Sequence, residues 1–308
     1  MPYPFLSPIA PQAPAALLAR ARARARAPRV ALVNAGAPHP LQGIREAADQ
    51  GLAEPVLLGD RAKILATAEE IGWDISGLRL IDAPHESAAP EAARLAGLGE
   101  VDAVMKGQIH TSTFLKALLP SAAGLREPGT RAGHVFHITA PGSDRPLLLT
   151  DAALNVDPDV ATRQACLAQA VALAQRLGVA HPKAGILAPT EDPIPSVPNT
   201  MEARAIADWA REALPDAIVE GPLALDLIFS EAAASAKGVT SRIAGDADIM
   251  VVPNITSGNA LFKLMVLGMG CCAAGIVLGL KVPVLLTSRA QTAPARLASA
   301  ALGAIMAP

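Results

Sequence analysis

The residues with the clearest chemical potential lie where a strand-like apolar run changes abruptly into an apolar run of helical length. In residues 250–267, MVVPNITSGNALFKLMVL, this junction holds Ser257, Gly258 and Asn259. A glycine lets backbone N–H groups approach an anion closely, and Ser and Asn side chains supply further donors. An N-cap followed by a turn uses the same residue types. This segment alone therefore leaves both interpretations open.

Similar polar clusters follow four other predicted strands. They are MKGQIHTS at 105–112, TDAALNVDPD at 150–159, EGPLALD at 220–226 and TSRAQT at 287–292. In open α/β sheets, ligands bind outside the carboxyl ends of the strands, where helix N-termini direct their N–H groups at the ligand. Capping alone does not account for so many polar strand ends. They predict a single cleft that binds an anionic ligand.

Short aliphatic or β-branched runs alternate with longer Ala/Leu-rich segments, which is typical of α/β proteins with mainly parallel sheets. The predicted strands are 29–34, 54–58, 78–81, 101–105, 134–139, 146–150, 184–188, 217–220, 249–252 and 282–286. The predicted helices are a solvated one at 17–27, then 41–50, 60–71, 90–98, 112–119, 158–177, one carrying Trp209 with Asn199 and Glu202 as a capping pair, and 294–306. We expect two α/β domains with a cleft between them, a discontinuous one of 1–148 plus 280–308 and an inserted one of 149–279.

Composition argues against several classes of protein. The 308 residues are 51% hydrophobic and 18% charged, which favours a large core over disorder. The net charge of −2 and the 3% aromatic content give no support to nucleic-acid or acidic-membrane binding, and the long apolar runs are broken by Gly, Lys and Pro. Cys166, Cys271 and Cys272 have no disulfide-framework or metal-knuckle spacing, so we expect a reducing, cytoplasmic location. The histidine spacing predicts no metal site.

Six blocks in order carry a family resemblance. They are MKG-x-x-x-T-S-x-F-L-x-A, TDAA-x-N-x-x-P-D, GPLALD-x-x-x-S-E-A-A, AGDADI-x-x-V-P with GN, AAGIVLG, and VP-x-x-LTSR. This order resembles the phosphate acetyl/butyryl transferases over most of the chain. The residues within the blocks are more similar to the phosphate butyryltransferase branch, and to the transferase module of enoyl-CoA hydratase/phosphate acetyltransferase fusions, than to housekeeping phosphotransacetylases.

The resemblance implies a fold and an activity. The fold is that of isocitrate and isopropylmalate dehydrogenases. The activity is reversible transfer of a short-chain acyl group, acetyl to butyryl, between coenzyme A and inorganic phosphate. Acyl-CoA, phosphate and acyl phosphate are then substrates, with no tightly bound cofactor, and the protein is expected to be a homodimer.

The resemblance also assigns roles to the pair that follows the last strand. Arg289 would hold the phosphate, because a guanidinium offers a fork of donors matched to phosphate oxygens at any working pH. Ser288 would donate to the charge that develops at the carbonyl oxygen or the sulfur. Taken in isolation, the same pair reads as a loop serine and a surface arginine.

Further substrate contacts are predicted at the other strand ends. Ser257, Gly258 and Asn259 would form an anion cradle opposite Arg289. Arg131 matches a second basic position of the family; otherwise it is a solvated charge at a strand edge. Lys106, Gly107 and Thr111 would line the same cleft, although the lysine would equally well be an exposed side chain.

One departure from the family pattern concerns the proton of the CoA thiol. Phosphotransacetylases carry an aspartate a few residues after the Ser-Arg pair, but Ala295 or its neighbour stands there, and no carboxylate occurs between Arg289 and Pro308. Either the site stabilises a thiolate, since a thiol with a pKa near 8.5 is partly ionised near neutrality, or Asp151, Asp226 or Glu191 acts from another loop. Asp151 and Asp226 are also predicted to contact substrate. Helix caps and salt bridges use these residue types too.

Two alternative functions remain open from the sequence. One is a nicotinamide- and metal-dependent dehydrogenase of the same fold. It is opposed by the absence of G-x-G-x-x-G after a strand and of an aspartate cluster suited to Mg²⁺. The other is an inactive homologue that binds CoA or acyl phosphate without turning it over.

Overall fold

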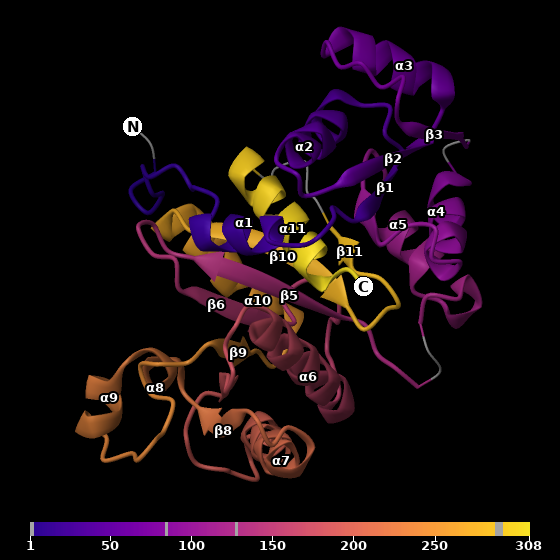
Figure 1. Ribbon diagram of the computed structural model, residues 1–308. Helices are drawn as coiled ribbons and strands as arrows, with labels where there is room; N and C mark the ends of the chain where they lie inside the picture. Colours follow the sequence, from indigo (N-terminus) through magenta and orange to yellow (C-terminus); the bar gives the residue numbers. More distant parts are fainter. Residues whose placement is uncertain (1–2, 84–85, 127–128, 287–291) are drawn as a thin grey trace. The chain divides into compact units, whose positions relative to one another are not determined.

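The computed structural model describes residues 3–83, 86–126, 129–286 and 292–308. The chain forms two compact units, Met1–Ala10 with Gly133–Ala273 and Pro11–Ala132 with Ala274–Pro308. We call them the 133–273 unit and the 11–132 unit. In each unit most neighbouring strands are parallel, and helices lie beside them (Figure 1). The mixed α/β architecture expected from the alternating pattern is therefore confirmed.

The 11–132 unit has the strand order β3-β2-β1-β4-β11-β10. The first five strands run parallel, and β10 pairs antiparallel with β11. The strands are β1 (Arg29–Val33), β2 (Glu54–Gly59), β3 (Arg79–Asp82), β4 (Ala103–Lys106), β10 (Cys272–Leu278, which begins in the last residues of the other unit) and β11 (Val284–Leu285). The helices are α1 (Ala15–Arg22), α2 (Pro38–Asp49), α3 (Arg61–Glu70), α4 (Ala88–Gly97), α5 (Thr111–Leu118), a 3₁₀ turn (Ser121–Ala123) and α11 (Ala293–Met306).

The 133–273 unit has the strand order β5-β6-β9-β7-β8, in which β5 and β6 form an antiparallel pair and the others run parallel to β6. The strands are β5 (Gly133–Thr139), β6 (Pro146–Thr150), β7 (Lys183–Leu187), β8 (Ile218–Leu223) and β9 (Ile249–Val251). The helices are α6 (Val160–Arg176), α7 (Pro198–Ala213), α8 (Leu225–Phe229), α9 (Glu231–Ala236) and α10 (Ile255–Lys263), which continues as a π-helical turn (Leu264–Gly268).

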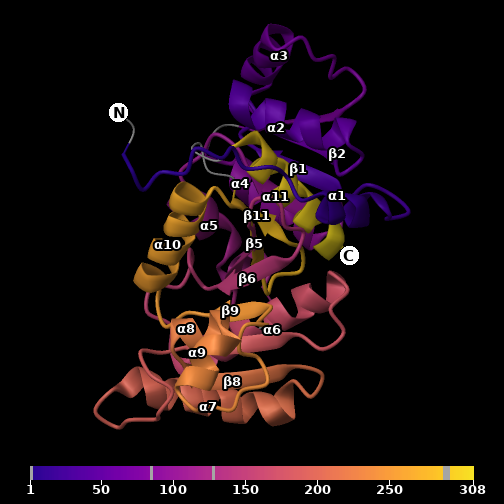
Figure 2. The same ribbon diagram turned by 90° about the vertical axis from the view of Figure 1, so that its left-hand side faces the viewer.

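The core of the 133–273 unit lies between its sheet and its helices. Every residue of β5 and of β9 is buried, as expected for strands that are covered on both faces. Figure 2 shows α6 and α10 on opposite sides of β5 and β6. Phe136, Leu149, Leu227 and Met250 are among the buried residues of one apolar cluster in this unit. Such burial stabilises the fold by roughly 25 cal/mol per Å² of apolar surface removed from water.

The predicted domains, 1–148 with 280–308 and 149–279, use later boundaries than the two compact units. The two divisions differ mainly in the treatment of β5 and β6. In the structure these strands pair residue by residue, with Val135 opposite Thr150 and Thr139 opposite Pro146. Both strands therefore belong to the 133–273 unit.

The first helix is shorter and better anchored than predicted. It ends at Arg22, and Leu17 and Ala21 are buried, so it is not simply a solvated helix. The arginines beyond it contact the fold, because Arg24 donates to the carbonyls of Ala307 and Pro308, each at 3.0 Å. Alternating Ala and Arg therefore supply one packed face and several polar anchors.

Two other predictions of elements differ from the structure, and one strand was not predicted. Asn199 does not cap α7, because it lies inside the helix behind Pro198, and Glu202 instead pairs with Arg163 at 3.3 Å. Strand β8 does not stop at Gly221 but continues to Leu223. Strand β10 was not predicted, because its Gly- and Ala-rich sequence is compatible with either a strand or a buried helix.

Three further features concern the helices, the clustering of ligand-type side chains and the cysteines. Among the described residues, no helix is long and apolar enough to cross a membrane. The same part of the chain holds no group of three or more His, Cys, Asp or Glu side chains placed to bind a metal ion. Cys166, Cys271 and Cys272 are free and buried.

Candidate functional site

The polar segments of the 133–273 unit meet at the carboxyl ends of β6 and β9. These strands are parallel neighbours, with Thr150 opposite Val251, and the Val252 N–H donates to the Thr150 carbonyl at 2.8 Å. The loop 151–155 and the segment 252–259 therefore leave the sheet side by side. We call this place the β6/β9 edge.

The Asp151 carboxylate organises the loop that follows β6. Asp151 is only 3% exposed. One carboxylate oxygen accepts from the N–H groups of Ala153 and Leu154, each at 2.9 Å. The other accepts from the His134 N–H at 3.1 Å, the Asn155 N–H at 3.3 Å and Asn155 Nδ2 at 2.7 Å. Five donors thus surround this carboxylate, an arrangement that holds the loop in place.

The small polar residues after β9 cap helix α10. The Asn254 side chain accepts from the Ser257 N–H at 3.0 Å. The Ser257 hydroxyl donates to the Asn254 carbonyl at 3.1 Å and lies 3.0 Å from the Asn254 side-chain oxygen. The Gly258 N–H donates to the same carbonyl at 3.2 Å. The capping interpretation left open by the sequence is therefore confirmed, and the predicted contact with an anion stays a prediction.

Gly258 lets α10 pack tightly on the loop after β6. A Cβ at this position would lie 2.8 Å from the Ala152 Cβ and 2.8 Å from the Val252 Cγ2, distances that real Cβ atoms do not show. Asn259 also reaches the loop, with Nδ2 3.5 Å from the Ala152 carbonyl oxygen. The sequence suggested that this glycine admits an anion, whereas the observed contacts show close packing of helix against loop.

A buried histidine lies next to the Asp151 loop. His134 is 1% exposed, its ring centroid lies 4.3 Å from that of Phe136, and Phe136 stacks on Phe262 at 4.0 Å. Burial lowers the pKa of His134 to about 4, although the negative charge of Asp151 acts in the opposite direction. The ring is therefore neutral near pH 7 and adds no positive charge to this edge.

The other carboxylates considered as bases lie after β7 and β8. Asp226, in α8, is exposed and pairs with Lys237 at 2.9 Å, and this contact holds its pKa below the usual value. Glu191, in the loop after β7, is partly buried and interacts electrostatically with Lys237. Both carboxylates therefore have a cationic neighbour.

In the 11–132 unit, the predicted residues Lys106 and Gly107 lie at the carboxyl end of β4, next to the end of β1. A Cβ on Gly107 would lie 2.3 Å from the Val33 carbonyl oxygen, so only glycine allows the two strand ends to come so close. Lys106, the last residue of β4, is 6% exposed and places Nζ 3.4 Å from the Gly107 carbonyl. The lysine is buried, contrary to the exposed alternative. Thr111, the first residue of α5, and Arg131 are exposed.

Ser288 and Arg289 lie outside the described residues. The strand before them, β11, is parallel to β4, with Leu285 opposite Met105. The structure therefore brings Asp151 together with Ser257, Gly258 and Asn259 in one unit, and Lys106 with Gly107 in the other.

Two residues of the β6/β9 edge were missed as site residues. Asn155 donates from its N–H and from its side chain to the Asp151 carboxylate. Asn254 directly follows a strand and precedes a helix, which is the position of an N-cap. Capping rules would have found Asn254, whereas no turn rule predicts the contact between Asn155 and Asp151.

Two opposing electrostatic contributions act on an anion at the β6/β9 edge. The N-terminus of α10 carries a partial positive charge, and hydrogen bonds satisfy the buried carboxylate of Asp151. The Asp151 carboxylate acts in the opposite direction, and the N–H groups of Ala153, Leu154 and Ser257 already donate within the protein. The partial positive charge at the N-terminus of α10 is therefore the feature that favours phosphate or a developing oxyanion here.

Comparisons with known proteins identify the family of this chain. Residues 85–304 match the family described as Phosphate acetyl/butaryl transferase. The chain is 38% identical over 294 residues to the phosphate acetyltransferase of Rhizobium meliloti, covering 93% of this chain and 92% of that protein. It is 36% identical over 269 residues to the phosphate butyryltransferase of Clostridium acetobutylicum, covering 87% and 89%.

A solved structure gives the same result. The crystal structure of a branched-chain phosphotransacylase from Enterococcus faecalis V583 superimposes with a TM-score of 0.78 at 29% identity, covering 91% of this chain and all of that one. The resemblance inferred from the six motif blocks is confirmed, while identities of 38% and 36% do not separate the acetyl from the butyryl branch. The chain belongs to the phosphate acetyl/butyryl transferase family.

Proposed function

We propose that this protein transfers a short-chain acyl group, acetyl to butyryl, reversibly between coenzyme A and inorganic phosphate. The observation that carries the proposal is the β6/β9 edge, where the Asp151 loop and the capped N-terminus of α10 lie side by side at the carboxyl ends of parallel strands. Membership of the family supports the acyl-transfer chemistry and does not favour the dehydrogenase alternative.

The reaction assigns a separate task to each predicted residue. A phosphate oxygen attacks the thioester carbonyl carbon, the carbonyl oxygen becomes negatively charged, and the carbon–sulfur bond then breaks to release the CoA thiolate. Arg289 holds the phosphate and Ser288 donates to the developing charge. Ser257, Asn259 and the N-terminus of α10 stabilise the anion from the opposite side.

The contacts of the carboxylates support a mechanism without a dedicated base. Five protein donors already bond to the oxygens of Asp151, and Asp226 is paired with Lys237. A CoA thiol with a pKa near 8.5 is partly ionised at neutral pH, so stabilisation of the thiolate is sufficient. In the direction from acyl phosphate to acyl-CoA, the rate should therefore rise with pH up to the pKa of the thiol.

Several finer features belong to the same proposal. The fold is of the isocitrate/isopropylmalate dehydrogenase type, and Lys106, Gly107, Thr111 and Arg131 contact the substrate. Coenzyme A and phosphate enter and leave as substrates, and no cofactor is held tightly. The protein acts in the cytoplasm as a homodimer. The family resemblance supports these features.

The direct test is release of free thiol from acetyl-, propionyl- and butyryl-CoA, with phosphate present or replaced by arsenate. We expect phosphate-dependent release with at least one of the three. Arg289→Ala should raise the KM for phosphate more than it changes the KM for acyl-CoA. Arg211→Ala is a matched control, since Arg211 is an exposed α7 residue paired with Asp208. Background release with all three acyl-CoA esters would favour the inactive binding homologue instead.

A further inference from the structure

The N-terminal segment 3–9 is held against the C-terminal end of α10. The Ser7 N–H donates to the Leu267 carbonyl at 2.7 Å. Gly270, with φ +71°, lies under the segment, where a Cβ would be 2.7 Å from the Ser7 hydroxyl and 3.0 Å from the Ile9 carbonyl oxygen. Both views show the start of the chain beside this end of α10 (Figures 1 and 2). The segment is therefore part of the folded 133–273 unit.

This contact gathers large apolar side chains on the surface. Of the 13 exposed large hydrophobic residues in the described part of the chain, seven lie here. Four come from the segment: Tyr3, Phe5, Leu6 and Ile9. Three come from the end of α10 and the turn after it: Leu264, Leu267 and Met269. Their exposed fractions range from 47% for Leu6 to 72% for Phe5. We call this surface the 3–9/264–269 face.

The segment and the end of α10 touch at several points along their length. Tyr3 and Phe5 have ring centroids 5.6 Å apart. A Cβ on Gly268 would lie 3.2 Å from both the Phe5 carbonyl oxygen and the Leu264 Cδ1, so the helix turn and the segment meet there. Ser7 and Ile9 extend the contact to Leu267 and Gly270.

The area of the face is that of an interface. A large apolar side chain presents on the order of 200 Å² when fully exposed, so these seven expose about 800 Å² together. The largest apolar patch of a typical monomer covers about 300–600 Å², whereas each partner in a standard protein–protein interface contributes about 800 Å².

The chemistry of the face restricts its partner. Residues 3–9 and 264–270 include no Asp, Glu, Lys, Arg or His. A nucleic acid or an anionic lipid surface would find no complementary charge within these residues, whereas an apolar protein surface would be complementary. A second copy of the chain offers a matching surface of the same size, because a twofold axis brings a patch against its own equivalent.

We propose that the 3–9/264–269 face is the contact between two copies of this chain. This names the surface that would form the proposed homodimer, and it does not depend on the acyl-transfer chemistry. The N-terminal segment then has a defined role, since it supplies four of the seven apolar side chains.

The test is sedimentation velocity of the full chain over a wide dilution series. The wild type should sediment at twice the 31.5 kDa mass of one chain. Phe5→Asp with Leu267→Asp should raise the dimer dissociation constant at least about 100-fold, because each charge is repeated across the axis. The matched control is Leu98→Asp, whose side chain is 63% exposed at the end of α4, and it should remain dimeric.

A second pair of variants guards against misfolding. Phe5→Ala with Leu267→Ala should weaken the dimer at least about tenfold while leaving the circular dichroism spectrum unchanged. A monomeric wild type, or a dimer that survives the Asp pair in folded form, would overturn the proposal. Binding of a monomeric wild type to neutral phosphatidylcholine vesicles would identify a membrane as the occupant and would overturn it as well. Thiol release measured on the same samples reports separately on the proposed function.

Discussion

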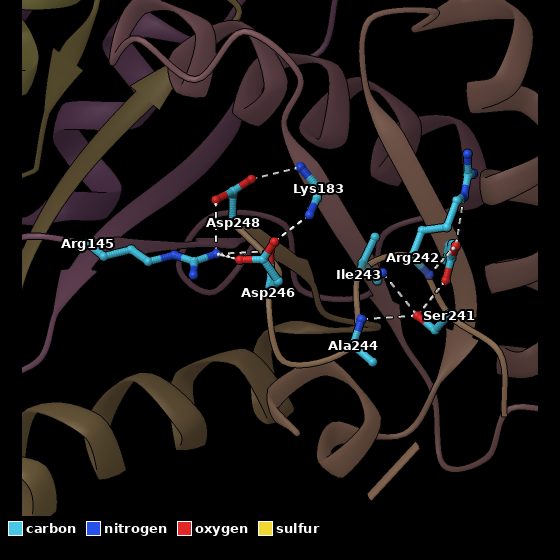
Figure 3. A network of polar contacts seen from close by, with 9 residues as sticks. Arg145, Lys183, Ser241, Arg242, Ile243, Ala244, Asp246 and Asp248 are labelled. Atoms are coloured by element: carbon cyan, nitrogen blue, oxygen red, sulfur yellow. Dashed lines mark hydrogen bonds and ion pairs between the residues drawn. The ribbon is translucent and has the colours of Figure 1, made fainter. Parts of the chain in front are cut away.

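The two ends of the parallel strands in the 133–273 unit are fixed in different ways. At the amino ends, charged side chains pair with one another (Figure 3). Arg145, just before β6, pairs with Asp246 at 2.6 Å and with Asp248 at 3.5 Å, and Lys183, at the start of β7, also pairs with Asp246. The Lys183 N–H donates to the Asp248 carboxylate at 2.9 Å. Arg145 and Asp246 remain about half exposed.

At the carboxyl ends, one buried carboxylate is held by neutral donors. Asp151 is 3% exposed and accepts five hydrogen bonds. Exposed ion pairs contribute little to stability because water and salt screen them, whereas a buried, bonded carboxylate is costly to disturb. Substitutions at the amino ends should therefore cost little stability. A substitution at the carboxyl ends should disturb several hydrogen bonds at once and cost more.

The largest expected effect is that of Asp151→Ala. It leaves the N–H groups of Ala153 and Leu154, among others, without their acceptor, and we expect a loss of roughly 4 kcal/mol in the free energy of unfolding. Thiol release should fall about 100-fold, because the loop beside the N-terminus of α10 would lose its position. Urea titration and initial rates would measure the two effects. Asp151→Asn keeps the shape of the side chain and should recover part of the lost stability. A loss below about 1 kcal/mol for the alanine variant would contradict the claim that Asp151 holds the loop 151–155 in place.

The next effect concerns acid sensitivity. Between pH 6.5 and about 4, the unfolded chain carries a proton on the ring of His134 that the folded chain does not, so stability should fall as pH falls through this window. The loss amounts to roughly 3 kcal/mol once pH is below the folded pKa. The pKa of Asp246 is lowered by its contacts with Lys183 and Arg145, so the amino ends should lose stability only below about pH 4.

Thermal unfolding as a function of pH would separate these two contributions. In His134→Gln, the slope between pH 6.5 and 4 should be smaller than in the wild type by about one bound proton. His137, also buried, has its pKa lowered to about 4 by burial and should account for part of the remaining slope. An unchanged slope in His134→Gln would show that the ring does not titrate as described.

A smaller effect is expected for Gly258→Ala. The new methyl group would meet Ala152 and Val252 at 2.8 Å and push α10 away from the loop, at a cost of about 1–3 kcal/mol. The catalytic efficiency should fall with it. Gly77→Ala is the matched control, because a Cβ there meets nothing within 4 Å. Equal melting temperatures for the two variants would argue against close packing at Gly258.

The smallest effect is expected for Asp246→Asn at the amino ends. The exposed ion pairs with Arg145 and Lys183 should contribute less than about 1 kcal/mol, and high salt should reduce the difference from the wild type further. Urea titrations at low and high salt would measure this. A loss as large as that of Asp151→Ala would remove the distinction between the two ends of the strands.

The alternation of apolar runs predicted the α/β class and nearly all of the strands, because buried parallel strands and amphipathic helices leave strong periodic signals. It did not predict β10, whose small residues fit either structure. The motif blocks predicted the family correctly. Asn199 was assigned as a cap by its spacing from Glu202, but Pro198 begins the helix one residue earlier and Glu202 contacts Arg163.

The candidate site was only partly accessible to sequence reasoning. The strand-end rule placed Asp151 and Gly258 at one edge of a sheet, and this is where they lie. It did not show that Gly258 packs on Ala152, since such a contact depends on three-dimensional spacing between distant residues. Nor did it show that the carboxylate of Asp151 is enclosed. The predicted roles of Ser288 and Arg289 lie outside the described residues and stay predictions.

The hydrogen bonds of Asp151 join residues that are close in sequence, and this has a consequence for ligand binding. Four of its five hydrogen bonds span four residues or fewer, and only the one from His134 crosses to another strand. A turn encoded over such short separations can form early in folding and needs no ligand to order it. An incoming anion then loses little affinity to conformational entropy of the loop. The main-chain conformation of residues 151–155 should therefore be the same in the free and the ligand-bound protein.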